Sequence, residues 1–275
     1  MDRHAVEPPQ VSTVNPPLTV TPPSTGGLSA NSRRFSGSFS MARSLREFAS
    51  EVELRPDDLV ADRSGRIDWA RAFGSHRPLR IEIGTGNSPF FIEVCRNAPA
   101  FNYLGFEYCG KRVLKFAKKV VQAKLDNLRI MRLDARVALE QFFLPESVDH
   151  FYINHPDPWP KRRHAKHRFI QQANVDTLTR LLASGGGISL RTDASAYAQQ
   201  MLEVLDGTTQ LVNTSGAGCF ADAPLEPYAT PFESKFRAQG LRIYYLEYRT
   251  VAGQTGKART PGLTRISHQL RSETQ

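Results

Sequence analysis

The sequence predicts an α/β domain in which a mostly parallel central sheet carries helices on both faces. Short apolar runs rich in β-branched residues alternate with longer amphipathic segments along the chain. The first of these runs leads directly into a glycine turn, Gly84-Thr85-Gly86, and then into a helix start. Strands that alternate with helices form parallel sheets with right-handed crossovers. With 275 residues, 40% of them hydrophobic, the chain is long enough to bury such a core.

The two ends of the chain differ in composition from its middle. Residues 1–45 are rich in Pro, Ser, Thr and Asn, which predicts a disordered N-terminal tail. They are poor in acids and contain several arginines, so a targeting peptide and a true start at Met41 are open alternatives. Residues 251–275 are polar and basic and are expected to form a C-terminal tail. The folded domain is therefore expected to span residues 46–250, and the scattered apolar positions of residues 46–75 should cover one face of its core.

The elements of the domain follow from local signals in chain order. The first strand is expected at Leu79–Ile83, and Ser88 and Pro89 then predict the N-cap and first position of a helix. A later helix over residues 169–183 is expected to end at Gly185-Gly186-Gly187. The other expected elements are strands at 103–107, 128–132, 148–153, 188–191 and 241–248 and helices over 109–124, 195–205 and 232–239.

Candidate ligand-binding residues follow from the strand ends. Open parallel sheets bind ligands outside the carboxyl ends of their strands. The residues just past the expected strand ends are Gly84, Gly86, Glu107, Asp134, Asp157 and Asp193.

These residues favour a nucleoside without phosphates as the ligand. Pro89 stands where a dinucleotide fingerprint has its third glycine, which disfavours a dehydrogenase. Glu107 lies about twenty residues past the glycines, where an acid can accept from ribose hydroxyls. Asp134 can accept from an adenine amino group. A nucleoside without phosphates that is surrounded by acids fits S-adenosylmethionine better than NAD, and Glu82 can compensate part of the positive charge of S-adenosylmethionine. The open alternatives are a plain turn for the glycines and helix caps for Glu107 and Asp134.

The stretch from His155 to Arg168 combines one acid with a strong positive charge. Prolines flank Asp157 and hold it in an extended or turn geometry near Trp159. Residues 161–168 contain five Lys or Arg and two His, so they must lie on the surface and suit phosphate groups. The open alternatives are a turn-forming aspartate, a solvated loop and a tryptophan that packs on the core instead of stacking on a base.

Composition limits the compartment and the partners. The net charge of +9 favours a polyanionic partner. Cys95, Cys109 and Cys219 lie far apart, and their spacing is not that of metal ligands. We therefore expect neither a disulfide framework nor a metal site, and we expect a cytoplasmic location. The sequence has no apolar run of about 18 residues, so no membrane span is expected.

From about Leu79 to Tyr248 the chain resembles the bacterial tRNA (guanine-N(7)-)-methyltransferases, which have the Rossmann-like class I S-adenosylmethionine-dependent fold. The most specific match is the block Pro156-Asp157-Pro158-Trp159-Pro160-Lys161-x-Arg163-His164-x-Lys166. The resemblance implies methyl transfer from S-adenosylmethionine to N7 of a guanine in tRNA, usually at position 46 of the variable loop. The other matching segments are Glu82-Ile-Gly84-x-Gly86, Gly105-Phe-Glu107, Asp134, Arg191-Thr192-Asp193 and Thr230-x-Phe232-Glu233.

The resemblance also implies a role for each matching position. Asp157 matches the catalytic position. The positions that bind the methyl donor are Glu82, Gly84, Gly86, Glu107, Asp134 and Asp157. The positions that hold the guanine substrate are Lys161, Asp193, Thr230, Phe232 and Glu233. The positions that contact the RNA are Arg163, His164, Lys166, His167 and Arg168.

Guanine N7 carries an in-plane lone pair, so catalysis is expected to be mostly alignment of N7 with the methyl group. A carboxylate at Asp157 or Asp193 can accept from guanine N1–H and N2–H₂ and offset the charge that methylation creates. The basic helix over residues 109–124 and the strip 161–168 would hold the tRNA backbone.

Three residues depart from the family pattern. His155 replaces Phe, Pro231 replaces Lys, and His167 replaces Arg. Pro231 removes a charge and an N–H group near the base. Two rival functions therefore stay open: a methyltransferase that acts on another RNA or base, and a catalytically inactive RNA-binding relative.

Overall fold

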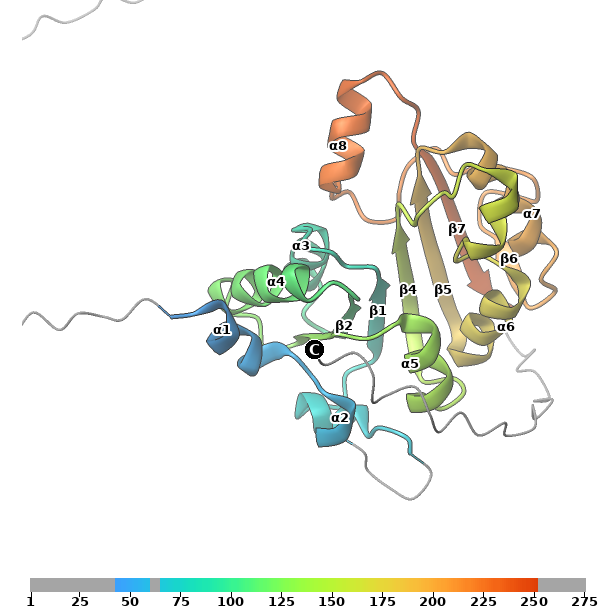
Figure 1. The fold of residues 1–275 in the computed structure, drawn as a ribbon. Helices are drawn as coiled ribbons and strands as arrows, with labels where there is room; N and C mark the ends of the chain where they lie inside the picture. Colours follow the sequence, from blue (N-terminus) through green and yellow to red (C-terminus); the bar gives the residue numbers. More distant parts are fainter. Residues whose placement is uncertain (1–42, 60–64, 252–275) are drawn as a thin grey trace, which may run out of the picture. The chain divides into compact units, whose positions relative to one another are not determined.

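The computed structural model describes residues 43–59 and 65–251, and its centre is a seven-stranded sheet in the order β3-β2-β1-β4-β5-β7-β6 (Figure 1). Neighbouring strands among β1 to β5 are parallel, whereas β7 is antiparallel to both β5 and β6. This is the mostly parallel α/β fold that the sequence predicts. The strands are β1 (Leu79–Ile83), β2 (Asn102–Phe106), β3 (Leu128–Met131), β4 (Val148–Asn154), β5 (Leu182–Thr192), β6 (Leu211–Asn213) and β7 (Tyr244–Thr250).

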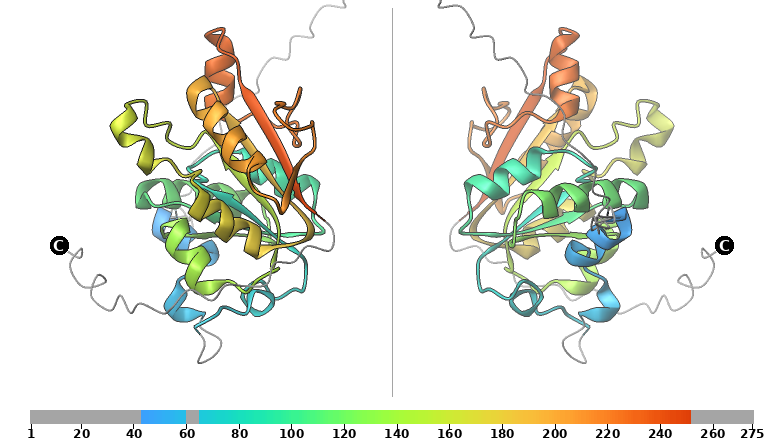
Figure 2. Two further views of the ribbon diagram at one scale, coloured as in Figure 1. Left: turned by 90° about the vertical axis from the view of Figure 1, so that its right-hand side faces the viewer. Right: turned by 90° about the vertical axis from the view of Figure 1, so that its left-hand side faces the viewer.

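Helices cover both faces of the sheet, as Figures 1 and 2 show. One hydrophobic cluster joins one sheet face to α1, α3 and α4, and a second cluster joins the other face to α2, α5, α6 and α7. Apolar side chains on the helices of these two clusters therefore face the sheet. The helices are α1 (Leu45–Val52), α2 (Trp69–Phe73), α3 (Phe90–Asn97), α4 (Gly110–Gln122), α5 (Ala135–Phe142), α6 (Gln172–Leu181), α7 (Ser195–Asp206) and α8 (Pro231–Ala238).

Helix α1 was not predicted from the sequence. The Ser44 hydroxyl accepts from the Glu47 backbone N–H, and the Glu47 carboxylate accepts from the Ser44 N–H, which together form a capping box. The last residue of the expected N-terminal tail, Leu45, is thus the first residue of a helix. Residues 1–42 of that tail and residues 252–275 of the other lie outside the described residues.

The turn after β1 is built around close backbone contacts. The N–H groups of Gly84 and Thr85 both donate to the carbonyl of Phe106 at the end of β2. Gly84 has a φ of 76°, which glycine adopts without strain. A Cβ on Gly105 would lie 2.4 Å from Thr85 Oγ1, so β2 needs a glycine here for Thr85 to fit. The resulting turn directs the backbone of residues 84–86 toward the end of β2.

The three glycines at 185–187 lie inside strand β5 and do not end the preceding helix, which corrects the sequence prediction. Helix α6 runs from Gln172 to Leu181, and β5 begins at the next residue. A Cβ on Gly186 would lie 2.9 Å from the carbonyl oxygen of Asp149, and one on Gly187 would lie 2.9 Å from that of Tyr248. These glycines allow β4 and β7 to approach β5 closely.

The C-terminal strands differ from the prediction in their number and bounds. The last strand begins at Tyr244 instead of residue 241 and runs antiparallel to β5. The short edge strand β6 lies in a segment for which the sequence predicted no strand. No helix among the described residues is long and apolar enough to cross a membrane.

Candidate functional site

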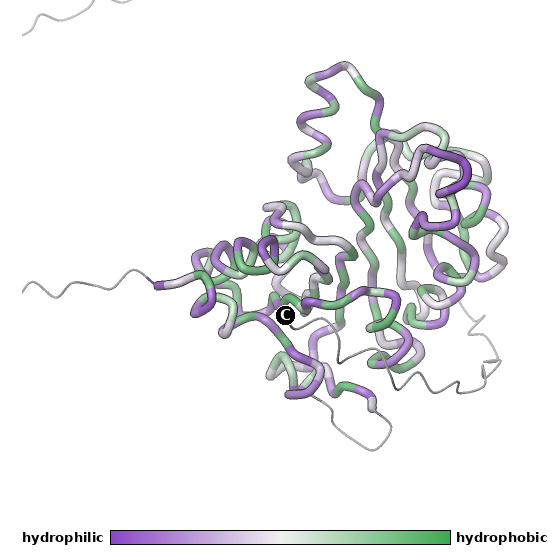
Figure 3. The backbone as a smooth tube through the Cα atoms, in the orientation of Figure 1, coloured by the Kyte–Doolittle hydropathy of each residue, from purple (hydrophilic) through white to green (hydrophobic). Residues whose placement is uncertain are grey.

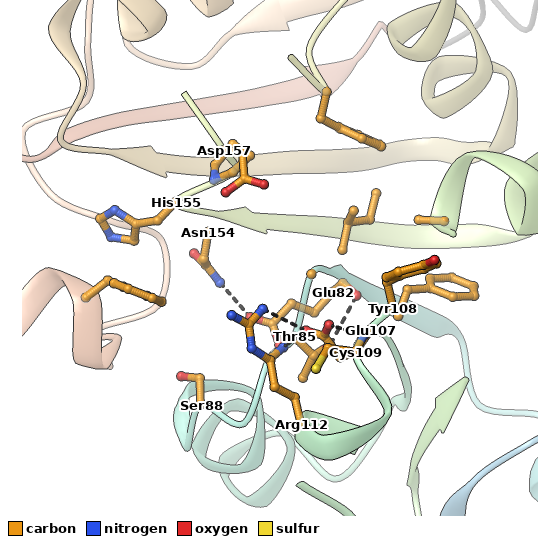
Figure 4. Close-up of a pocket in the computed structure, with 18 of the residues that line it drawn as sticks. Glu82, Thr85, Ser88, Glu107, Tyr108, Cys109, Arg112, Asn154, His155 and Asp157 are labelled. Atoms are coloured by element: carbon orange, nitrogen blue, oxygen red, sulfur yellow. Dashed lines mark hydrogen bonds and ion pairs between the residues drawn. The ribbon is translucent and has the colours of Figure 1, made fainter. Parts of the chain in front are cut away.

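A pocket of about 950 Å³ opens at the carboxyl ends of β1, β2 and β4. Figure 4 shows His155 and Asp157 on one side of this pocket and Glu107 and Arg112 on the other. The sequence-predicted site residues that line it are Glu82, Gly84, Gly86, Glu107, Asp134, Asp157, His167, Thr230 and Phe232. Those that do not line it are Lys161, Arg163, His164, Lys166, Arg168, Asp193 and Glu233.

Glu82 is a buried carboxylate with one oxygen left free at the base of the pocket. It lies on β1, is 1% exposed, and its Oε1 accepts from Asn154 Nδ2 at 2.8 Å. Its Oε2 is buried without a hydrogen-bond partner in the described part of the chain. Burial raises the pKa of Glu82 to about 8. A cationic ligand group would give this oxygen both a partner and a compensating charge.

Glu107 is held in place by the backbone around the glycine turn. Its Oε2 accepts from the Gly86 N–H at 2.9 Å, and its Oε1 accepts from the Cys109 N–H at 2.7 Å. The Arg112 guanidinium lies 3.8 Å from Oε2. Because Glu107 is only 6% exposed and fixed from two sides, its remaining lone pairs have a defined direction at the pocket wall.

Asp134 lies at the pocket and also caps a helix, which is the alternative that the sequence left open for it. It lines the pocket, and it is also the N-cap of α5, where its Oδ1 accepts from the Arg136 N–H. The Arg136 guanidinium pairs with both carboxylate oxygens. Hydrogen bonding from Arg136 lowers the pKa of Asp134, so the carboxylate is charged.

Asp157 lies on an exposed loop after β4, on the side of the pocket opposite Glu107 (Figure 4). Within residues 43–59 and 65–251, no group donates a hydrogen bond to its carboxylate. The loop is strained, because His155 has a φ of 47° and Trp159 a φ of 40°. Trp159 is 38% exposed and does not pack into the core; its ring lies against those of His164 and His167.

Asp193 and His155 form a pair beside the pocket. Nδ1 of His155 lies 3.2 Å from Oδ1 of Asp193, and Nε2 of the same ring is buried without a partner among the described residues. Burial lowers the pKa of His155, so the ring is neutral and donates from Nδ1. Its other neighbours are the rings of Phe232 and Phe236 on α8.

The start of α8 explains both Pro231 and Glu233. Thr230 is the N-cap and accepts from the Glu233 N–H, and Pro231 occupies the first helical position, where its missing N–H costs nothing. Glu233 is 1% exposed and points into the protein, whereas Phe232 is 57% exposed at the pocket rim. The departure at Pro231 is thus compatible with an intact helix start.

The basic segment that follows Asp157 forms a short 3-10 helix over Arg162–His167, and Figure 3 shows this stretch as strongly hydrophilic. Lys161, Arg163 and Lys166 are exposed, and His164 is partly exposed. These side chains project from the protein next to the pocket and can meet an extended polyanion.

Several pocket residues were missed from the sequence alone. Tyr108 is 72% exposed directly after Glu107 and offers an aromatic face inside the pocket. Asn154 ends β4 and holds Glu82, and Lys235 brings a charge from α8. Asn154 could have been found because it is the polar residue directly after the expected strand 148–153; Lys235 had no such signal.

A resident metal has no support in this part of the chain. Among the described residues, no group of three or more His, Cys, Asp and Glu side chains is arranged to hold a metal ion. The pocket lining combines carboxylates, cationic side chains, an amide and backbone groups, which suit an organic ligand.

Comparisons with known proteins agree with this geometry. Residues 76–246 match the profile of a family described as "Putative methyltransferase". A tRNA (guanine-N(7)-)-methyltransferase of Syntrophotalea carbinolica is 34% identical over 80% of this chain and 93% of its own length. A second one, from Neisseria meningitidis serogroup B, is 40% identical over 71% of this chain and 76% of its own.

Among solved structures, TrmN from Thermus thermophilus superposes with a TM-score of 0.45 at 17% identity, over 66% of this chain and 47% of its own. The profile match covers most of the chain, and the sequence relatives are matched over most of their length. The chain belongs to the tRNA (guanine-N(7)-)-methyltransferase family.

Proposed function

We propose that the protein transfers a methyl group from S-adenosylmethionine to N7 of a guanine in tRNA, at position 46 of the variable loop. The observation that carries this proposal is the free, buried Oε2 of Glu82, at the base of a pocket that lies next to the basic segment 161–168. A ligand that is cationic at one end and joined to a larger, uncharged nucleoside fits this arrangement. Family membership supports the same donor and the same acceptor.

The residues present fit the methyl donor. Glu82 would accept from its amino group, and Glu107 would accept from the ribose hydroxyls with the lone pairs that Gly86 and Cys109 leave free. Tyr108 would stack on the adenine ring. Asp134 would reach the adenine amino group only with lone pairs that Arg136 does not occupy.

S-adenosylmethionine, when bound, supplies an electrophilic methyl group on a positively charged sulfur. Asp157 would accept from guanine N1–H or N2–H₂ and orient the ring, so that N7 lies in line with the methyl group. Its negative charge would offset the positive charge that develops on the base. Asp193 would also accept from the guanine. Its side chain is 27% exposed beside the pocket, and its pair with His155 fixes its orientation.

The basic strip supports tRNA as the polyanion. Lys161, Arg163 and Lys166 extend from the loop that carries Asp157, so phosphate contacts there would bring a neighbouring nucleotide to the pocket. Cys95, Cys109 and Cys219 are free thiols, which supports the expected cytoplasmic location.

The test is methylation of unmodified tRNA with a labelled donor, followed by nucleoside analysis. The expected product is 7-methylguanosine, and a matched transcript with adenine at position 46 should remain unlabelled. Label in another nucleoside would indicate another RNA or base as substrate. Binding of tRNA without any transfer, combined with no donor binding by calorimetry, would indicate an inactive RNA-binding relative.

A further inference from the structure

Arg168 ends the basic segment, yet its guanidinium points into the protein. Its Nε donates to the carbonyl oxygen of Pro158 at 2.7 Å, and its Nη1 donates to Gln200 Oε1 at 2.5 Å. Its Nη2 lies 3.5 Å from the carbonyl oxygen of Trp159. The side chain is only partly exposed. All three nitrogens of the guanidinium thus face protein oxygens, and two of those oxygens belong to the loop that carries Asp157.

The other cations of the same segment behave differently. Lys161, Arg162 and Lys166 are exposed, and within the described ranges none of their side chains forms a hydrogen bond or an ion pair. The Nε of Arg163 contacts only the ring of its neighbour His164, at 3.2 Å. The segment therefore contains exposed cations and one cation, Arg168, whose guanidinium is bound to other parts of the protein.

The platform on which Arg168 rests is rigid. Its guanidinium carbon lies 4.9 Å from the ring centroid of Tyr197 on α7, and this ring is fully buried. The Tyr197 hydroxyl accepts from the N–H of Ile170, and Gln200 Nε2 donates to the carbonyl of Ile170. Both backbone groups of Ile170 are thus fixed to α7, two residues after Arg168.

The loop around Asp157 needs such an external donor. Prolines at 156, 158 and 160 have no N–H group, and no N–H of residues 156–160 donates to a described backbone carbonyl. Trp159 adopts a φ of 40°, which is costly for a residue with a side chain. A conformation of this kind persists only where its surroundings hold it, and Arg168 donates to the two carbonyls that follow Asp157.

We propose that Arg168 is a positioning residue that holds the Asp157 loop against α7, and that it is not one of the phosphate-contacting cations of the basic segment. This inference rests on the proposed methyl transfer, in which Asp157 orients the guanine. Loss of Arg168 should then disturb alignment at the base and leave the number of phosphate contacts unchanged. Lysine cannot replace it, because one ammonium group cannot donate to Pro158 and Gln200 in the planar geometry of a guanidinium.

The experiment compares Arg168→Ala and Arg168→Lys with the double variant Arg163→Ala/Lys166→Ala as matched control. Turnover at saturating tRNA and the slope of log affinity against log salt are measured for each. We expect both Arg168 variants to lose about 10- to 100-fold in kcat, as misplaced reacting groups do, with a wild-type salt slope. The Arg163→Ala/Lys166→Ala variant should instead show a slope shallower by about one to two, since each lost phosphate contact removes roughly 0.7–0.9.

Gln200→Ala tests the same anchor from α7, away from the basic segment. It should lower kcat in the same direction, and Arg168→Ala/Gln200→Ala should be no worse than Arg168→Ala alone. Normal kcat with a shallower salt slope in Arg168→Ala would overturn the inference. If Arg168→Ala does not fold, Gln200→Ala decides, and a normal kcat there overturns it as well. Wild-type protein that methylates no guanine would instead reject the proposed function.

Discussion

Arg191 at the end of β5 and Glu233 in the first turn of α8 form an ion pair of 2.8 Å inside the protein. Arg191 is 3% exposed and Glu233 is 1% exposed. Arg191 also donates to the carbonyls of Glu226 and Tyr228, so it fixes both the loop before α8 and the helix itself. Glu233 also accepts from the Tyr245 hydroxyl and pairs with Arg237, so it is a structural anchor of the segment at the pocket rim.

Glu233→Gln should destabilise the protein by about 2–4 kcal/mol, because it leaves the buried charge of Arg191 without its partner. The matched control is Glu93→Gln, which breaks the exposed pair with Arg96 and should cost less than about 1 kcal/mol. Urea denaturation of both variants measures the difference. Equal free energies of unfolding for the two variants would contradict a structural role for Glu233.

The stability of the ligand-free protein should depend on Glu82. Its pKa is raised from 4.5 to about 8, so the folded protein keeps a proton that the unfolded chain loses above pH 4.5. Stability from this group is complete below pH 4.5 and is lost as the pH rises through 8. Glu82→Gln imitates the protonated acid and removes this dependence.

Glu82→Gln should therefore match the wild type near pH 4.5 and exceed its stability at pH 8 by roughly 1–3 kcal/mol. Thermal unfolding across this pH range, without donor, measures the effect. Glu93→Gln again serves as control, because Glu93 is partly exposed. A constant difference between wild type and Glu82→Gln at every pH would show that Glu82 is ionised in the folded protein.

His155 should titrate below its ordinary range. Burial lowers its pKa from 6.5, so below that pH the unfolded chain gains a proton that the folded protein does not, and stability falls. His155→Phe removes this loss and the unpartnered Nε2, and it places a phenyl ring beside Phe232 and Phe236. We expect a stability gain of about 1 kcal/mol at neutral pH that grows as the pH falls.

Thermal unfolding from pH 5 to 8 measures the gain from His155→Phe. His164→Phe is the control, since His164 is partly exposed and lies outside this pair. A gain that shrinks in acid would mean that the ring of His155 is charged and paired with Asp193. The same variant also removes the hydrogen bond to Asp193, so its KM for tRNA reports whether that bond orients the carboxylate.

The strand core was predictable because its signals are local. Leu79–Ile83 is an apolar, β-branched run followed by glycines, and its bounds agree with β1. The edge strand Leu211–Asn213 has three residues in a Gly- and Ala-rich stretch, too short for an alternating pattern. The glycines at 185–187 were misread as a helix end because their purpose, close approach of β4 and β7, depends on strands distant in the sequence.

The site was predictable to the same limit. Glu107, Asp134 and Asp157 were expected to lie together because each follows a strand end, and all three line one pocket. What each side chain contacts could not be predicted, because the partners come from other elements. Arg168 is the clearest case: composition groups it with the surface cations, whereas only the packing of α7 shows where its guanidinium points.

The domain boundary can be tested by truncation. A chain that starts at Met41 keeps the capping box of α1 and should retain methylation and stability. A chain that starts at residue 54 loses α1, which packs against α4 and buries Ala49 and Val52. We expect it to lose roughly 2–5 kcal/mol through exposed apolar surface. Urea denaturation compares the two chains; loss of methylation in the chain from Met41 would extend the functional domain toward the N-terminus.

Asp157 provides the sharpest test of the site, because its carboxylate is exposed and has no partner among the described residues. Removing its charge should therefore cost the fold little. Asp157→Asn keeps the shape of the side chain and can still accept from the guanine with its amide oxygen, whereas Asp157→Ala removes both charge and acceptor. If the charge offsets the positive base, both variants should lose turnover, by about 100-fold or more for Ala and less for Asn.

These losses should persist at saturating tRNA and saturating donor, since they concern alignment and charge at the reacting base. The measurement is kcat together with calorimetric donor affinity and thermal unfolding for each variant. Asp176→Asn is the control. Asp176 is another exposed acid and lies on α6, so this variant should be indistinguishable from wild type. A normal kcat for Asp157→Ala would reduce this residue to a turn former, and the orientation of the guanine would then have to depend on Asp193, the remaining acid beside the pocket that His155 holds in place.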